Sequence, residues 1–157
     1  MTTVLTADEE ANALLVGDPW GFLCGVICDY QMPADRAWAT PYNLAQRLGG
    51  FSVELIATHP ERVHAAFLGP PAIHRFPNQT TDFVVEGARR VLDEYGGDAA
   101  AVWSDEPTAR ELQDRLVRFN RHLMIEAMSR APVLNLLPPL SVRLAVQPLW
   151  SLVEFGA

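Results

Sequence analysis

The stretch "WGFLCGVICDYQMP", residues 20–33, is an apolar run that stops abruptly at a polar sequence and a proline. Between Phe22 and Tyr30, its large apolar side chains recur at i, i+1, i+4, i+5 and i+8, the spacing of a helix buried along a broad stripe. Asp18, followed by a proline, is the expected N-cap of this helix. The sequence therefore predicts a helix buried along a broad stripe that ends in a short polar segment carrying Gln31.

Helix signals continue along the chain, and no segment alternates apolar and polar residues as a half-buried strand would. Thr6, with Glu9 three residues later, has the pattern of a capping box. An apolar stripe from Val84 to Tyr95 is followed by two glycines, which suit a helix C-terminus. Further helices are expected over residues 34–48, from Ser52, from Pro60, and from Asp105 along a stripe that includes Leu116, Phe119 and Leu123. The expected fold class is all-α, with about seven helices.

The composition is that of one globular domain: 157 residues, of which 49% are hydrophobic and 20% are charged. The formal net charge of -7 argues mildly against a protein that binds nucleic acid through its overall charge, although it is compatible with a local basic patch. All 12 basic residues are arginine. The absence of lysine excludes every mechanism that needs a lysine amine, Schiff-base chemistry included.

The two cysteines, Cys24 and Cys28, lie on the same predicted helix and are expected to be buried thiols. No spacing of cysteine and histidine supplies the further ligands that a metal site needs, so no metal and no cofactor is expected. Trp20, Trp38 and Trp103 lie within apolar stripes and are expected in the core. The N-terminal sequence has no basic segment ahead of an apolar one, so we expect no secretory signal and a cytoplasmic protein.

Residues 117–157 differ in character from residues 1–116. The first 116 residues carry 17 acidic residues and 8 arginines, whereas the last 41 carry 2 acidic residues and 4 arginines. The final part is apolar but interrupted by prolines, without the roughly 18 uninterrupted apolar residues that a membrane span needs. We expect a helical region over 1–116, no membrane partner, and an apolar tail over 117–157 that packs on this region, is poorly ordered or supports self-association.

Three segments in this order resemble the helix-hairpin-helix DNA glycosylase superfamily: "DPWGFLCGVICDYQMP", "AWATPYNLAQRLGG" and "HRFPNQTTDFVVEGARRVLDEYGGDAAAVW". They are most similar to small HhH-GPD-type base excision DNA repair proteins. The resemblance covers roughly residues 4–116 and rests on the order and spacing of several segments rather than on one motif. It implies a helical domain whose ligand is double-stranded DNA with a damaged, extruded base.

The resemblance also implies site residues. In this superfamily the loop after the corresponding helix commonly carries a glutamine that enters the duplex and fills the space left by the extruded base, and Gln31 stands at that place. An amide suits the role because it can donate to and accept from the unpaired partner base. Arg75, Asn78 and Thr80 stand where relatives approach the DNA backbone, at the start of a helix. The alternative for these residues is structural: Gln31 satisfies a helix end, and the others provide an N-cap and a solvated arginine.

The chain departs from the superfamily after Leu116. There the Leu-Pro-Gly-x-Gly hairpin, whose amides hold a phosphate, should begin, but this chain has no glycine between Gly97 and Gly156. The stripe in this region predicts one continuous helix in place of the hairpin. The catalytic aspartate that should follow is also missing, and Glu126 is the remaining candidate, although its position suits a helix surface. Divergence of the family fold and a fused or frameshifted tail would each explain the departure.

Three functions stay open at this point. The first is base excision repair by a monofunctional DNA N-glycosylase that extrudes a base, with lysine-dependent lyase activity excluded. The second is a non-catalytic protein that binds damaged DNA. The third is a degenerate helical interaction protein without DNA binding. The sequence does not select a lesion, a base or an oligomeric state.

Overall fold

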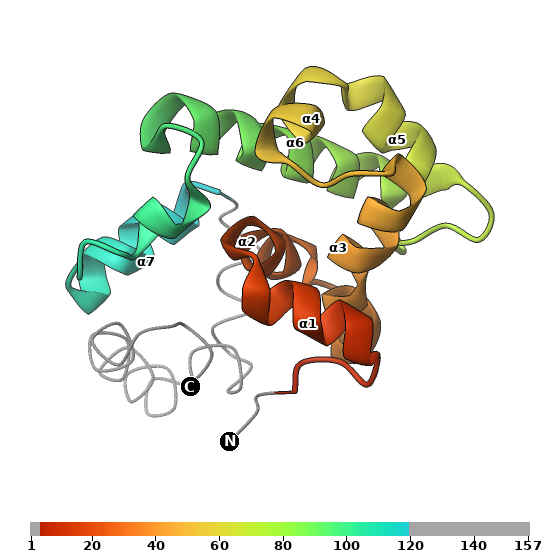
Figure 1. The fold of residues 1–157 in the computed structure, drawn as a ribbon, viewed down its shortest axis with the longest axis horizontal. Helices are drawn as coiled ribbons and strands as arrows, with labels where there is room; N and C mark the ends of the chain where they lie inside the picture. The colour runs from red at the N-terminus through yellow and green to blue at the C-terminus, as the bar shows by residue number, and fades with distance from the viewer. Residues whose placement is uncertain (1–3, 120–157) are drawn as a thin grey trace.

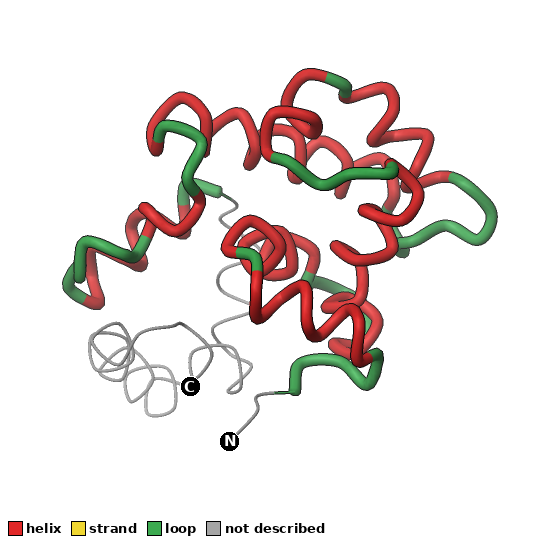
Figure 2. The backbone as a smooth tube through the Cα atoms, in the orientation of Figure 1, coloured by secondary structure: helices red, strands yellow, loops and turns green. Residues whose placement is uncertain are grey.

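In the computed structural model, residues 4–119 are described, and they form helices joined by short connections, with no strand (Figure 2). This confirms the all-α fold class and the expected number of helices. The helices are α1 (Glu9–Gly17), α2 (Pro19–Cys28), α3 (Ala34–Leu48), α4 (Val53–Thr58), α5 (Pro60–Leu68), α6 (Pro77–Tyr95) and α7 (Ala109–Val117), with a 3-10 helix η1 (Ala99–Val102) between the last two.

Helix α2 is the centre of the molecule. Nine of its ten residues are buried, because α1, α3, α6 and η1 all pack against it (Figure 1). Helices α4 and α5 pack on α6, and α7 lies at the opposite end of the molecule beside η1 (Figure 1). A helix that is apolar on every side is stable only when it is enclosed in this way, so the composition of α2 accounts for its central place.

The residues that begin the helices agree with the sequence at three positions and differ at two. The side chains of Asp18 and Ser52 accept from the amides of Trp20 and Leu55, and Pro60 opens α5, as expected. The expected cap at Thr6 is wrong, because Asp8 is the N-cap of α1 and the Thr6 hydroxyl donates to Asp35 in α3 at 3.1 Å. Helix α7 is capped by Thr108, with Glu111 completing a capping box, whereas Asp105 forms an ion pair with Arg115 at 2.6 Å.

Two helices end earlier than their apolar stripes predict. Helix α2 ends at Cys28, so Tyr30 belongs to the following loop, although its side chain is buried. Helix α7 ends at Val117, so the expected continuous helix through Phe119 is wrong in the described part of the chain. In both places an apolar side chain beyond the helix end still reaches the core: Phe119 stacks on Tyr95 with ring centroids 6.2 Å apart. Burial therefore extends the stripe further than the helix itself.

The expected boundary after residue 116 falls in the last turn of α7. The predictions for residues 120–157, including self-association through the apolar tail, lie outside the described residues. Within the described residues no single helix has the length and apolar character to cross a membrane, and only the pair α1 and α2, bent by 115°, reaches that threshold together.

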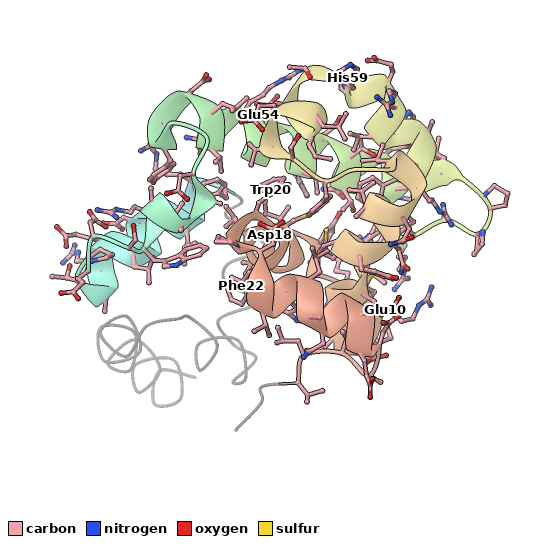
Figure 3. All side chains as sticks on the ribbon, in the orientation of Figure 1. Glu10, Asp18, Trp20, Phe22, Glu54 and His59 are labelled. Carbon is pink, nitrogen blue, oxygen red and sulfur yellow. The ribbon has the colours of Figure 1, made fainter. Side chains whose placement is uncertain are left out.

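Trp20, Trp38 and Trp103 are buried as predicted, and so are both thiols. Phe22 lies between two of them, with ring centroids 5.7 Å from Trp38 and 5.9 Å from Trp103. Figure 3 shows Trp20 and Phe22 pointing from α2 into the interior, while Glu10 lies on the outside, where it accepts from the hydroxyl of Tyr42. The aromatic side chains thus join α2 to α3 and to the segment that follows η1.

Two glycines allow the neighbouring helices to approach α2 closely. A Cβ atom on Gly25 would lie 2.6 Å from Cε3 of Trp38, a buried ring whose Nε1 donates to Asp29. A Cβ atom on Gly87 of α6 would lie 2.7 Å from Cδ1 of Ile27. Both distances are shorter than van der Waals contact, so these glycines set the spacing of α2 from α3 and from α6.

We expect Gly25→Ala to lower the free energy of unfolding by about 1–3 kcal/mol, because the added methyl group must displace a buried indole. Urea unfolding followed by circular dichroism measures this change. Gly17→Ala is the matched control, since a Cβ atom there meets nothing within 4 Å and should leave stability unchanged or slightly higher. Equal stabilities of the two variants would contradict the packing role of Gly25.

Candidate functional site

The predicted site begins at residues 29–33, which connect α2 to α3 and are called the Gln31 loop here. Gln31 is exposed and has φ +49°, a left-handed conformation that costs a residue with a Cβ atom about 1–2 kcal/mol. Its two neighbours are buried: Tyr30 is 5% exposed and Met32 is 7% exposed. Asp29 is also buried and accepts from Trp38 at 3.2 Å. The loop therefore presents Gln31 to solvent between two anchors in the core.

Arg75, 44 residues further along the chain, lies beside Gln31. Its Nη1 donates to the backbone carbonyl of Gln31 at 3.5 Å, and its guanidinium carbon lies 5.3 Å from the ring centroid of Phe76. The Arg75 side chain is exposed. Two of the residues that the sequence singled out from separate segments thus share one surface. Arg36, in the first turn of α3, adds a second exposed cation near this surface.

Thr80 does not reach this surface, because it is fully buried below it. Its hydroxyl lies 2.6 Å from the hydroxyl of Tyr30 and donates to the carbonyl of Phe76 at 2.7 Å. Burial raises the pKa of Tyr30, which keeps that phenol protonated. The place of Thr80 is therefore that of a support: it holds the Gln31 loop against the start of α6.

Asn78 is exposed, but it faces a different part of the molecule. Its Oδ1 accepts from Nε2 of His64 at 2.6 Å, in a groove of about 640 Å³ between α5 and α6. The groove is also lined by the carboxylates of Glu61, Asp82 and Glu86. These carboxylates make a poor environment for phosphate, so Asn78 is separated by its surroundings from the pair formed by Gln31 and Arg75.

The sequence did not indicate a role for His74, although this residue contacts the end of α2, the Gln31 loop and the start of α6. It is 2% exposed; Nε2 lies 2.9 Å from the carbonyl oxygen of Cys28, and Nδ1 accepts from the amide of Phe76 at 3.1 Å. Its ring stacks on Tyr30 with centroids 4.7 Å apart. Burial lowers the pKa of His74; the hydrogen bond to the Cys28 carbonyl opposes this shift, and Arg36 adds to it. A lone histidine in a proline-rich connection carries no sequence pattern that would have revealed this role.

Within residues 4–119, the carboxylate of Asp35 and the two thiols near the Gln31 loop are hydrogen-bonded or buried. No cluster of three or more His, Cys, Asp or Glu side chains in the described part of the chain could hold a metal ion. Asp35, close to the Gln31 loop in sequence, accepts from the amide of Ala7 at 2.6 Å and from the Thr6 hydroxyl. Both cysteines are buried, and burial raises the pKa of Cys28 well above its ordinary value. Glu126, the candidate catalytic acid, lies outside the described residues.

No protein-family model matches this chain, and no curated protein and no solved structure is significantly similar to it. The relationship to the helix-hairpin-helix glycosylases therefore stays a prediction from the residues quoted above.

We expect Thr80→Val to lower the free energy of unfolding by about 1–3 kcal/mol, because the buried Tyr30 hydroxyl would lose its partner. Thr81→Val is the matched control. Thr81 is also buried, but its hydroxyl donates only within α6, to the carbonyl of Pro77 at 2.7 Å. Chemical denaturation of the two variants measures the difference. If Thr81→Val were as costly as Thr80→Val, the Tyr30 contact would not be what supports the loop.

Proposed function

We propose that this chain binds double-stranded DNA at an extruded or missing base and acts in base excision repair, with Gln31 as the group that enters the duplex. The observation that carries the proposal is the exposed amide in a left-handed conformation between two buried neighbours. Strained backbone of this kind persists where the surrounding structure enforces it, and it concentrates at functional sites. Because its buried neighbours hold it in place, the backbone at Gln31 loses little conformational freedom on binding.

The chemistry of the surface suits this ligand. A duplex with an extruded base contains an unpaired partner whose donors and acceptors need to be satisfied, and one amide offers both kinds of group. Arg75 places positive charge beside Gln31, where phosphate groups flanking the vacancy would lie. The protein as a whole is acidic, with a formal net charge of -7, so binding would depend on this local charge and weaken with salt.

The first experiment is a fluorescence anisotropy titration with two duplexes, one intact and one with a stable abasic-site analogue, each at low and high salt. We expect tighter and salt-sensitive binding to the abasic duplex. Gln31→Gly should reduce this preference by about fivefold to tenfold, the equivalent of about 1–1.4 kcal/mol. Glycine adopts positive φ readily, so the loop is retained and stability should stay within about 1 kcal/mol of the wild type.

Gln46→Ala is the control for this experiment, because Gln46 is an exposed glutamine on α3 outside the Gln31 loop. It should leave both affinities unchanged. Equal affinity of the wild-type protein for the two duplexes would contradict the role of Gln31. Absence of binding to either duplex would favour the third function, a helical interaction protein without DNA binding.

The hydrolytic step of the proposal rests on the resemblance. A monofunctional enzyme would hydrolyse the N-glycosidic bond of the extruded base, with a carboxylate assisting the attack of water. If Glu126 is that group, Glu126→Gln should reduce cleavage of damaged duplexes by about 100-fold or more while leaving binding intact. A gel assay of abasic-site formation measures cleavage. Unchanged cleavage would remove Glu126 from the mechanism, and binding without any cleavage would favour the non-catalytic protein that binds damaged DNA.

A further inference from the structure

His74 joins the two segments that carry Gln31 and Arg75. One ring nitrogen is bonded to Cys28 at the end of α2, and the other is bonded to Phe76 at the start of α6. Gln31 follows the first contact by three residues, and Arg75 lies between His74 and the second. We infer that His74 is a positioning residue of the Gln31–Arg75 surface, and that its neutral ring sets the spacing of these two side chains. The inference takes its ligand, a duplex with an extruded or missing base, from the proposed function.

The hydrogen bonds fix the tautomer of His74. Nδ1 accepts from the backbone amide of Phe76, so it carries no proton, and Nε2 must carry the proton that is donated to Cys28 O. Thr80 Oγ1 lies 3.0 Å from Nδ1, and the carbonyl of Phe76 also lies within its reach. Because these two acceptors compete for the one hydroxyl proton of Thr80, the Tyr30 hydroxyl must donate to Thr80. In this series of hydrogen bonds, the Tyr30 hydroxyl in the Gln31 loop therefore donates to Thr80 in α6, and not the reverse.

A second proton on the ring would break this arrangement. Protonated Nδ1 is a donor and would face the Phe76 amide, which is also a donor. The ionisable groups around the ring are the Tyr30 phenol, the Cys28 thiol, Arg36 from α3 and the neighbouring Arg75, while α6 contributes the uncharged Thr80. Burial raises the pKa of Tyr30 and of Cys28, so both stay neutral, and the arginines oppose further positive charge. The carbonyl of Cys28, which accepts from Nε2, favours the charged imidazole, but burial of the ring outweighs it and the pKa of His74 is lowered.

The contribution of His74 to stability depends on pH, and the lowered pKa of the ring gives the direction of this dependence. The pKa of His74 is lowered in the folded protein, so the unfolded chain, with an ordinary pKa of about 6.5, takes up the proton first. The contribution of His74 to stability is therefore fully present above about pH 6.5 and is lost as the pH falls toward the lowered folded value. The spacing of Gln31 and Arg75 should change with the protonation of the folded ring, at a midpoint below about pH 6.5.

Nuclear magnetic resonance tests the inference without DNA. In the full-length protein labelled with nitrogen-15, the ring of His74 should be protonated on Nε2 alone near neutral pH. Between about pH 8 and about pH 5, the backbone amides of Gln31 and Arg75 should shift with the same midpoint as His74. In His74→Gln these shared shifts should disappear. His64→Gln is the control and should leave them in place, because His64 bonds to Asn78 in the groove between α5 and α6.

The inference is overturned if the amides of Gln31 and Arg75 do not follow His74 in the wild-type protein, or if their shifts persist in His74→Gln. If His74→Gln does not fold, the wild-type titration alone tests the inference. It gives separate midpoints for the His74 ring and for the amides of Gln31 and Arg75, and these can be compared directly. The titration is then repeated with Thr80→Ser, which keeps the hydroxyl and should keep the coupling.

The duplex titrations separate this inference from the proposed function. The preference for the abasic duplex should fall by about fivefold across the His74 midpoint, the loss expected for one hydrogen bond. If coupling is observed and neither duplex binds at any pH, the proposed function fails while the positioning of the loop by His74 stands. If the duplexes are discriminated equally well at every pH, the spacing set by His74 does not matter for binding and the inference fails.

Discussion

The enclosure of α2 is the constraint on which the rest of the structure depends. A helix with nine of its ten residues buried needs neighbours on all sides, and Gly25 and Gly87 let α3 and α6 come close enough to provide them. Close packing then determines where the chain can leave the core. It leaves directly after Cys28, into a short loop in which Tyr30 and Met32 stay buried while Gln31, between them, faces solvent.

Local chemistry made much of the fold predictable. The Asp18 and Ser52 caps, the glycines after α3 and α6, and the apolar stripes each act within a few residues, and the structure agrees with them. Contacts between distant segments were not predictable in this way. Thr6 had the pattern of a cap but bonds to Asp35 across 29 residues, and the apolar stripes of α2 and α7 continue past the helix ends because burial, not helical geometry, selects those residues.

The same division applies to the candidate site. The resemblance identified Gln31 and Arg75, and the structure brings these two together, but it places Thr80 beneath the surface and Asn78 among carboxylates. His74 has no helical or motif signal, since its role comes from three partners that belong to the end of α2, the Gln31 loop and the start of α6. A residue whose function is to join segments is visible only when the segments are seen together.

The left-handed conformation of Gln31 also affects which residues can replace it during evolution. Glycine at this position would relieve the backbone strain without disturbing the buried neighbours, and asparagine would reduce it. Mutation alone would therefore tend to replace glutamine in any descendant that no longer used the amide. The residue found at this position in descendants of this chain would then record whether the loop is still under selection for what its side chain does.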